Sequence, residues 1–252
     1  MEVNGNWGGG GTLLVGDCTD PEAVARLVGD ARIDLLLTDP PYGVGYSSAA
    51  GDVPGDDLGE ADFLELLTSS FRNACSCMRP GACFYIFFGG VNAFTFTSAL
   101  RQAGLDLHQV LVWVKNQAIL GRSDYQNGYE PCLGGELPAG GEYDPILYGW
   151  KPGAAHTFRY DRKQSSVLRF DKPTKSSLHP TMKPVPLFDY LMKAGSYPGD
   201  NILDPFAGSG TALIAGQQNG RNVYAIEKDP RYADVIISRW EAFTGQKAEQ
   251  IE

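Results

Sequence analysis

Short apolar runs alternate with helical patterns along most of the chain, and this alternation constrains the fold more than any other feature. Ile33–Thr38 is an apolar run that ends at an acidic turn, and Glu60–Cys77 has apolar residues at helical spacing. Strands that alternate with helices favour an α/β fold with a mostly parallel sheet and helices on both faces. The expected strands are Leu13–Gly16, Ile33–Thr38, Ala82–Phe88, Leu107–Lys115, Asn201–Leu203 and Asn222–Ile226. The expected helices are Pro21–Val28, Glu60–Cys77, Asn92–Ala103, Pro184–Lys193, Thr211–Gln218 and Pro230–Phe243.

The length of 252 residues suits one large domain, and we expect a single domain over residues 1–252. The stretch Asn116–Ser177 differs from the rest because it is rich in Gly, Tyr, Pro and basic residues and has no clean period. We therefore expect residues 116–177 to form a module inserted in the α/β core. Within it, Gly128–Glu142 indicates a loop insertion.

Charge is distributed unevenly along the chain. The 30 Asp and Glu residues outnumber the 21 Lys and Arg residues, and this net charge of −9 disfavours a nucleic-acid partner, because phosphate contacts need cations. Residues 1–62 contain twelve acidic and two basic residues, whereas residues 151–183 contain eight basic and two acidic ones. The basic segment is either a solvated loop or a phosphate-binding patch. Its candidate phosphate contacts are Lys151, Arg159, Arg162, Lys163 and Arg169.

The cysteines lack the paired spacing of a metal site. Cys18, Cys75, Cys77, Cys83 and Cys132 contain no Cys-x-x-Cys pair, so we expect reduced, structural thiols and no metal. No apolar run approaches the roughly 18–20 residues that a transmembrane helix needs. The N-terminal sequence has neither the basic start nor the apolar run of a signal peptide, so we expect a cytoplasmic protein.

The turn after the second expected strand carries the first chemical motif, Thr38–Gly43. It lies at the carboxyl end of a strand, where open α/β sheets bind ligands. Pro40 and Pro41 stiffen the turn and leave its carbonyls free, and Asp39 adds a carboxylate acceptor. These acceptors suit the two hydrogens of an NH2 group, and Tyr42 offers a face for a planar ring. A plain strand-ending turn is the simpler alternative.

A glycine-rich turn later in the chain carries the second motif. Asn201–Thr211 indicates a strand, a turn with two glycines and a helix start, where backbone can approach an anionic group closely. The dinucleotide and phosphate-loop patterns both fail, because Leu213 replaces the third glycine and no lysine follows the second. Glu227 ends the next strand, where an acid suits ribose hydroxyls, and Asp204 suits an ammonium group.

These two motifs, with His179–Pro184 between them, resemble the S-adenosylmethionine-dependent amino methyltransferases of DNA. The Asp-Pro-Pro-Tyr turn precedes the Asp-Pro-Phe-Ala-Gly-Ser-Gly-Thr loop, an order similar to that of the beta group of these enzymes. The resemblance covers about Leu13 to Arg239 and weakens in Gly128–Glu142. It implies a circularly permuted, Rossmann-like methyltransferase sheet, in which residues 116–177 are the target-recognition region.

The resemblance also implies roles for individual residues. The catalytic residues would be Asp39, Pro40, Pro41 and Tyr42. The cofactor-binding residues would be Asp17, Cys18, Asp39, Thr181, Lys183, Asp204, Phe206, Ala207, Gly208, Ser209, Gly210, Thr211 and Glu227. Thr181 and Lys183 would flank the methionine carboxylate, and Asp17 would contact the adenine. Asp144–Tyr148 matches one further segment of the family better than the similar Tyr129–Leu133.

The resemblance therefore implies methyl transfer, without a metal, to the N6 amine of an adenine flipped out of double-stranded DNA. Asp39 favours adenine over the alternative of cytosine N4, and a non-catalytic DNA-binding relative is a further alternative. Methylation of cytosine carbon 5 is disfavoured, because its cysteine nucleophile would have to be Cys132 in the loop-like segment. We expect a stand-alone modification enzyme of the restriction–modification type, as a monomer or homodimer.

Overall fold

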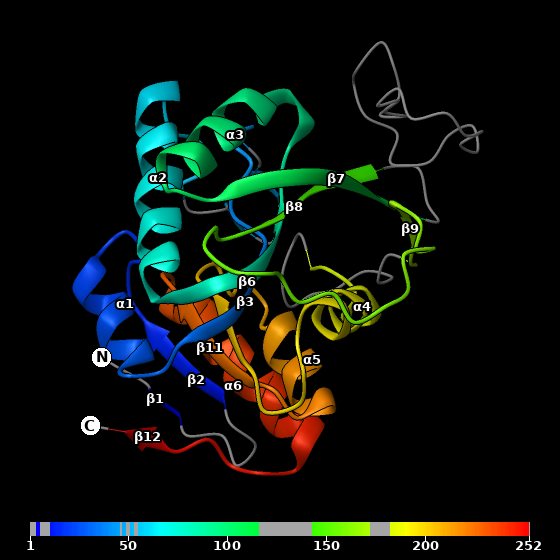
Figure 1. The fold of residues 1–252 in the computed structure, drawn as a ribbon. Helices are drawn as coiled ribbons and strands as arrows, with labels where there is room; N and C mark the ends of the chain where they lie inside the picture. Colours follow the sequence, from blue (N-terminus) through cyan, green and yellow to red (C-terminus); the bar gives the residue numbers. More distant parts are fainter. Residues whose placement is uncertain are drawn as a thin grey trace.

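The computed structural model describes residues 4–5, 11–45, 47–48, 51–52, 55–115, 143–171 and 182–251. Eight strands of this part form one sheet in the spatial order β2, β11, β10, β3, β6, β8, β7, β9 (Figure 1). These strands are β2 Gly11–Val15, β3 Ile33–Thr38, β6 Met78–Phe87, β7 Asp106–Val114, β8 Tyr143–Trp150, β9 Val167–Arg169, β10 Asn201–Asp204 and β11 Asn222–Glu227. Neighbours from β2 to β6 pair in parallel, as do β7 and β9, but β8 is antiparallel to β6 and β7. The expected mostly parallel α/β sheet is confirmed.

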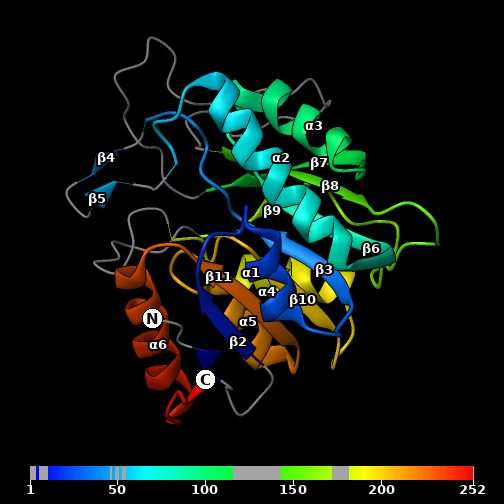
Figure 2. The same ribbon diagram turned by 90° about the vertical axis from the view of Figure 1, so that its left-hand side faces the viewer.

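The helices of the described residues cover both faces of the sheet (Figures 1 and 2). They are α1 Pro21–Val28, α2 Glu60–Cys77, α3 Ala93–Gln102, α4 Val185–Gly195, α5 Thr211–Asn219 and α6 Pro230–Thr244. The buried side chains of α1, α2 and α3 belong to one apolar cluster, and those of α4, α5 and α6 belong to a second. The sheet therefore separates two cores, each built from one face and three helices.

Two helices begin at an aspartate that caps the first turn. Asp20 Oδ1 accepts the N–H of Glu22 at 2.9 Å, and Asp229 Oδ1 accepts the N–H of Arg231 at 2.9 Å. A proline fills the first helical position in both cases, where its missing N–H costs nothing. Short capped connections of this kind bring the strand ends β2 and β11 close to the starts of the helices that follow.

Strand β8 lies inside the segment that was expected to be an inserted module. Tyr143–Trp150 pairs with β6 on one side and β7 on the other, so this part of residues 116–177 belongs to the main sheet. The sequence hides the strand because Pro145 and Gly149 interrupt its apolar pattern. The glycine is required, since a Cβ at Gly149 would lie 2.0 Å from the carbonyl oxygen of Asp106.

Two pairs of short strands and one 3-10 turn of the described residues lie outside the eight-stranded sheet. They are β1 Asn4–Gly5 paired with β12 Gln250–Ile251, β4 Ser47–Ser48 paired with β5 Gly51–Asp52, and the 3-10 turn η1 Gly90–Asn92. Across the described part of the chain, no helix combines the length and apolar character needed to cross a membrane.

The parallel strands β2, β11, β10, β3 and β6 all end at the same edge of the sheet, which we call the carboxyl edge. The opposite edge, where these strands begin, is the amino edge. Because β8 is antiparallel to β6, its first residues lie at the carboxyl edge and its last residues at the amino edge. Both predicted motifs follow strands that end at the carboxyl edge, so the fold brings them together.

Candidate active site

The Asp-Pro-Pro-Tyr turn, residues 39–42, follows β3 and is held from two sides. Asp56 is buried, and its Oδ1 accepts the backbone N–H groups of Tyr42 at 2.7 Å and Gly43 at 2.8 Å. Asn92 Nδ2 donates to the carbonyls of Tyr42 at 2.7 Å and Gly43 at 3.1 Å. Gly43 has a φ of +68°, and a Cβ there would lie 2.8 Å from a neighbouring aromatic ring. These contacts fix the position of the acceptors in the turn.

Asp39 is the first member of a buried chain of alternating charges. Lys183 Nζ lies 2.7 Å from Asp39 Oδ2 and 3.4 Å from Asp144 Oδ2. Lys115 Nζ lies 2.9 Å from Asp144 Oδ1. The lysine side chains are only 5–6% exposed. Two ammonium groups and two carboxylates thus balance one another, which buried charges require.

Tyr42 covers one end of this chain of charges. Its hydroxyl donates to Asp39 Oδ1 at 3.1 Å. The Lys183 ammonium lies 5.1 Å from the centre of the Tyr42 ring and 5.3 Å from that of Phe87, so aromatic rings as well as carboxylates stabilise it. In this structure the ammonium therefore occupies the acceptor that the sequence assigns to an NH2 group.

The two carboxylates of the chain differ in proton affinity. Burial raises the pKa of Asp39, although Lys183 acts in the opposite direction. Burial also opposes the ionisation of Asp144, but the ammonium groups of Lys183 and Lys115 outweigh it and lower the pKa of Asp144. Asp144 thus remains ionised between two lysines, and Asp39 is the better proton acceptor. Paired groups with pKa values shifted in opposite directions are typical of acid–base chemistry.

The glycine-rich loop, residues 205–210, joins β10 to α5 beside the turn. Gly210 has a φ of +76°, and a Cβ there would lie 2.9 Å from a side chain of α6. Arg239 Nη1 donates to the carbonyl of Ser209 at 2.8 Å and to the hydroxyl of Ser209 at 3.2 Å. It also lies 3.4 Å from the Thr211 hydroxyl. Ser209 and Thr211 are buried, so their hydroxyls help to hold the loop in place.

Asp204 and Glu227 supply the negative charge beside this loop. Glu227 Oε2 accepts the N–H of Gly208 at 2.8 Å, and its Oε1 accepts that of Asp229 at 2.9 Å. Asp204 Oδ1 accepts the N–H of Phe206 at 3.3 Å. Burial raises the pKa of Asp204 and that of Glu227 to about 7 each. A ligand that brings positive charge or hydrogen-bond donors would favour the ionised form of both.

Two hydrogen bonds join the turn to the glycine-rich loop. The hydroxyl of Thr38, the residue before the turn, donates to Asp204 Oδ1 at 2.7 Å. The Thr211 hydroxyl donates to the backbone carbonyl of Lys183 at 3.2 Å. Both contacts are buried. The two predicted motifs are therefore parts of one connected site.

Three of the residues predicted to bind a cofactor need separate mention. Asp17 lies at the end of β2, with Oδ2 2.7 Å from Lys228 Nζ and Oδ1 accepting from Thr19, and these contacts lower its pKa against the effect of burial. Thr181 lies outside the described residues. The Cys18 side chain is buried.

Cys18 faces the protein core. Its Sγ lies 3.3 Å from the hydroxyl of Ser70 on α2, and its carbonyl accepts from Asn73 Nδ2 at 3.0 Å. Burial raises the pKa of the thiol to about 12. Its side chain and its carbonyl are both engaged with α2, so the predicted contact of Cys18 with a cofactor would have to come from its backbone N–H.

Lys151 and Arg159, two of the predicted phosphate contacts, lie away from the catalytic turn. Lys151 Nζ donates to two backbone carbonyls at the C-terminal end of α2, both at 2.9 Å. Arg159 Nη1 donates to the carbonyl of Ser196, which follows α4, at 2.9 Å. Both contacts lie at the amino edge, the opposite end of the strands from Asp39. The two cations form hydrogen bonds with carbonyls at the ends of α2 and α4. They do not share a surface with the catalytic turn.

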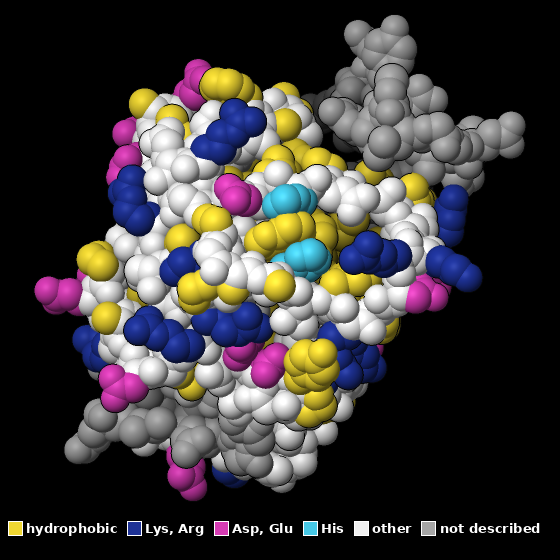
Figure 3. Space-filling model, viewed as in Figure 1, with side chains coloured by type: hydrophobic (Ala, Val, Ile, Leu, Met, Phe, Trp, Pro, Cys, Tyr) yellow, Lys and Arg dark blue, Asp and Glu magenta, His cyan; other side chains and the backbone are white. Residues whose placement is uncertain are grey.

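The other predicted phosphate contacts are spread over the molecule. Arg162 and Lys163 are exposed on the segment between β8 and β9. Arg169 ends β9, which runs parallel to β7, and so lies towards the carboxyl edge. His108 and His156 stack on the two faces of the Trp150 ring. Figure 3 shows that Lys and Arg side chains are scattered over the face on which the described histidines lie. Of the predicted basic contacts, only Arg169 lies towards the catalytic end of the sheet.

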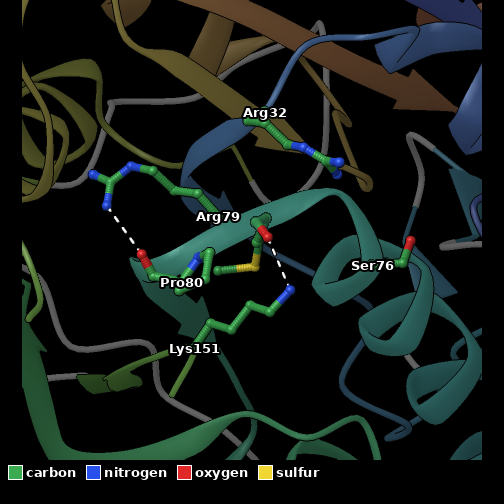
Figure 4. Close-up of a pocket in the computed structure, with 6 residues that line it drawn as sticks. Arg32, Ser76, Arg79, Pro80 and Lys151 are labelled. Atoms are coloured by element: carbon green, nitrogen blue, oxygen red, sulfur yellow. Dashed lines mark hydrogen bonds between the residues drawn. The ribbon is translucent and has the colours of Figure 1, made fainter. Parts of the chain in front are cut away.

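A cavity of about 380 Å³ lies at the amino edge. Its lining comprises Arg32, Ser76, Met78, Arg79, Pro80 and Lys151. Figure 4 shows the guanidinium groups of Arg32 and Arg79 pointing away from each other, and Lys151 pointing towards the carbonyl of Met78. Arg79 is engaged with Asp34 at 2.6 Å. The cavity is remote from the turn and its cations do not converge, so it is not part of the candidate site.

The structure adds site residues that were not predicted. They are Asp56, Asn92, Lys115, Asp144 and Arg239. Asp144 begins a segment that the sequence singled out, and Lys115 ends an expected strand, but nothing in their spacing indicates that they meet. The other three hold the turn and the glycine-rich loop from outside the motifs.

Comparison with known proteins gives a consistent result. The profile of N6_N4_Mtase, described as DNA methylase, matches residues 33–238. Among curated proteins, the Type II methyltransferase M.HpaI of Haemophilus parainfluenzae is 26% identical over 246 residues, which cover 88% of this chain and 72% of that protein.

Solved structures agree on the fold. The crystal structure of an M1.HpyAVI–SAM complex superposes with a TM-score of 0.66 at 21% identity, covering 91% of this chain and 98% of that one. PvuII DNA methyltransferase, described as cytosine-N4-specific, superposes with a TM-score of 0.67 at 15% identity, covering 94% and 90% of the two chains. At these identities the likeness concerns the fold.

Proposed function

The chain belongs to the N6_N4_Mtase family of DNA methylases, and from this premise we propose that it methylates the N6 amine of an adenine in double-stranded DNA with S-adenosylmethionine as the methyl donor. The observation that carries the proposal is the meeting of two motifs at one sheet edge. The Asp39 turn offers acceptors for an amine, and the loop beside it offers the Asp204 and Glu227 carboxylates.

The residues around the glycine-rich loop fit the proposed cofactor. Glu227 ends β11 and is buried, a position that suits the two hydroxyls of a ribose. Asp204 suits a positively charged group, and the loop glycines allow close approach of its backbone. M1.HpyAVI, solved as a SAM complex, has the same fold. When bound, S-adenosylmethionine supplies the methyl group and takes up the electron pair of its carbon–sulfur bond.

The turn positions the amine. Asp39 and the carbonyl of Pro40 would accept the two hydrogens of the amine and so direct its nitrogen lone pair towards the methyl carbon. Lys183 now holds Asp39 Oδ2, and Asp144 is its second carboxylate partner at 3.4 Å. The incoming amine would displace the ammonium from Asp39, and Lys183 would keep Asp144. Asp39 would then take the proton that the methylated nitrogen loses.

The target base has to leave the duplex to reach this turn. Extrusion costs a few kcal/mol, on the order of what stacking on one aromatic ring returns. Tyr42 supplies such a ring next to the acceptors, and Asp56 and Asn92 hold its backbone. The ring is only partly buried and can therefore receive a base.

Residues 116–177 outside β8 are the proposed target-recognition region. Arg169 remains the proposed DNA contact on the catalytic side, because it ends β9 next to the carboxyl end of β7. Arg162 and Lys163 are exposed but lie away from the turn, so any contact that they make would be to flanking DNA. We place the protein among modification enzymes of restriction–modification type, as M.HpaI is a Type II methyltransferase.

The test is methyl transfer from labelled S-adenosylmethionine to unmethylated double-stranded DNA, followed by analysis of the nucleosides. We expect label in N6-methyladenine. Label in N4-methylcytosine alone would show that the target is cytosine N4 and not adenine N6, because the same turn accepts either amine. Absence of transfer, together with tight DNA binding, would support the non-catalytic alternative.

A further inference from the structure

Two apolar side chains project into solvent beside the catalytic turn. Val91 is 89% exposed and Phe94 is 80% exposed. The next most exposed large apolar side chain of the described residues, Tyr197, is 53% exposed. Single exposed apolar residues are common, but two such residues next to a candidate site call for a function.

The local structure places the two side chains together. Val91 belongs to η1, and Phe94 follows in the first turn of α3. Residues three apart in a 3-10 turn lie on the same side of it. The opposite side of α3 carries the buried residues Thr95, Phe96, Ala99 and Leu100. Val91 and Phe94 therefore form an apolar point that the protein core does not use.

The apolar point is attached to the catalytic turn. Asn92 lies between its two residues in the chain and donates to the carbonyls of Tyr42 and Gly43. Gly89 sits against the turn as well, since a Cβ there would lie 3.1 Å from the Tyr42 Cβ. Any movement of the point relative to Tyr42 would break these contacts. The distance between the apolar point and Tyr42 is therefore fixed. A partner that approaches the turn meets both.

Extrusion of the target base leaves a gap in the DNA base stack that an apolar side chain could fill. A base that leaves the stack opens a gap between its neighbours. Apolar side chains can insert between base steps, and an aromatic ring that stacks on the exposed bases there compensates for lost stacking. We propose that Phe94, with Val91 beside it, inserts into the DNA base stack at the gap left by the target base. This proposal rests on the proposed function, because it requires a base that is flipped towards Tyr42.

Duplex DNA is a better occupant of this surface than a second protein. A protein that covered Val91 and Phe94 permanently would stand beside the turn and hinder the approach of a base. The stacked bases that flank the target, in contrast, must pass close to the turn whenever the target reaches Asp39. An aromatic ring that stacks on a base contributes about 1–3 kcal/mol.

The test uses Phe94→Ala and two duplexes that contain the methylation site found with the wild-type protein. In one duplex the target adenine is paired, and in the other it faces an abasic position and needs little extrusion. We expect kcat/KM to fall about fivefold or more on the paired duplex and less than threefold on the other. Cofactor affinity should not change, because Phe94 is remote from the glycine-rich loop.

Phe243→Ala is the matched control, since Phe243 is an exposed aromatic residue at the end of α6. It should leave both duplexes unaffected. Equal loss on both duplexes with Phe94→Ala, or no loss on either, would overturn the proposal. A change from dimer to monomer in Phe94→Ala, measured by light scattering, would assign the point to a subunit contact instead. If the wild type methylates no DNA, the proposed function fails and the insertion proposal fails with it.

Discussion

The two edges of the sheet use charged residues in opposite ways. At the carboxyl edge, Lys183 and Lys115 face the carboxylates of Asp39 and Asp144. At the amino edge, Lys151 faces backbone carbonyls at a helix end. A carbonyl at a helix end has no partner within the helix, so the cation completes a structural element. A carboxylate can exchange one partner for another, so the carboxyl edge keeps its acceptors available to a ligand.

A count of basic residues therefore does not locate a binding surface. Residues 151–183 are rich in basic residues although the chain as a whole is acidic, yet Lys151 and Arg159 are engaged with carbonyls at the amino edge. The basic residues at the carboxyl edge, Lys115 and Lys183, are fewer, and they are buried. If the comparison is correct, substitutions at the two edges should affect different measurements.

The largest difference is expected from Asp39→Ala. Loss of the acceptor should lower kcat for methyl transfer on the order of 10³-fold, because the amine would no longer be oriented. Cofactor affinity, measured by calorimetry, should change only a few-fold. Asp34→Asn is the control from the start of the same strand, where the carboxylate binds Arg79, and it should leave kcat unchanged. Loss of cofactor affinity in Asp39→Ala would give Asp39 a structural role.

Asp144→Asn should show that the carboxyl edge depends on its charge balance. The substitution removes the carboxylate that the buried Lys115 and Lys183 ammonium groups share, and we expect the free energy of unfolding to fall by about 3 kcal/mol or more. Urea unfolding followed by circular dichroism measures this change. Lys115→Met combined with Asp144→Asn removes the excess charge and should recover part of the loss. No recovery in the double variant would contradict the alternating-charge description.

The pH dependence of cofactor binding should be carried by the carboxyl edge alone. Asp204 and Glu227 have pKa values of about 7 in the free protein, and a cofactor that favours their ionised forms must release their protons. Affinity should therefore fall as the pH falls, by about tenfold per carboxylate between pH 8 and pH 6. Calorimetry in buffers of different ionisation enthalpy measures the proton release. Glu227→Gln should show a shallower dependence, and an unchanged slope would exclude Glu227 as a coupled group.

Lys151→Met should have the smallest effect and should concern stability only. Two hydrogen bonds to carbonyls at the end of α2 are lost, and we expect a loss of about 1–2 kcal/mol in the free energy of unfolding. DNA affinity and its salt dependence should match those of the wild type. Arg169→Ala is the contrasting variant, expected to weaken DNA binding without changing stability. Weaker DNA binding by Lys151→Met, with DNA binding by Arg169→Ala unchanged, would instead support Lys151 as a DNA contact.

Much of the fold could be predicted because local patterns determine it. The helices Pro21–Val28 and Glu60–Cys77 and the strand Ile33–Thr38 have the expected bounds. Strand β8 could not be predicted, because the proline and glycine that interrupt its pattern are tolerated only through its pairing with two neighbours. The need for Gly149 comes from the carbonyl of Asp106, a contact that exists only in the folded sheet.

Some residues of the site could likewise be predicted from local patterns, and others could not. Asp39, Asp204 and Glu227 could be predicted because each follows or ends a strand, and parallel strands end at one edge. The contact of Lys115 with Asp144 could not, because it depends on β8 pairing in antiparallel register with β7. The direction of the Cys18 thiol could not be predicted either, because it depends on the turn after β2, which directs the thiol towards α2.

The hydrogen bonds from Thr38 to Asp204 and from Thr211 to the Lys183 carbonyl have a thermodynamic consequence. They connect the glycine-rich loop, which would bind the methyl donor S-adenosylmethionine, with the Asp39 turn, which would bind the target base. A ligand that shifts one of these groups changes the free energy of the other, and such coupling is reciprocal. The factor by which the donor alters DNA affinity must equal the factor by which DNA alters affinity for the donor. The size of this shared factor then depends on two buried hydroxyl groups.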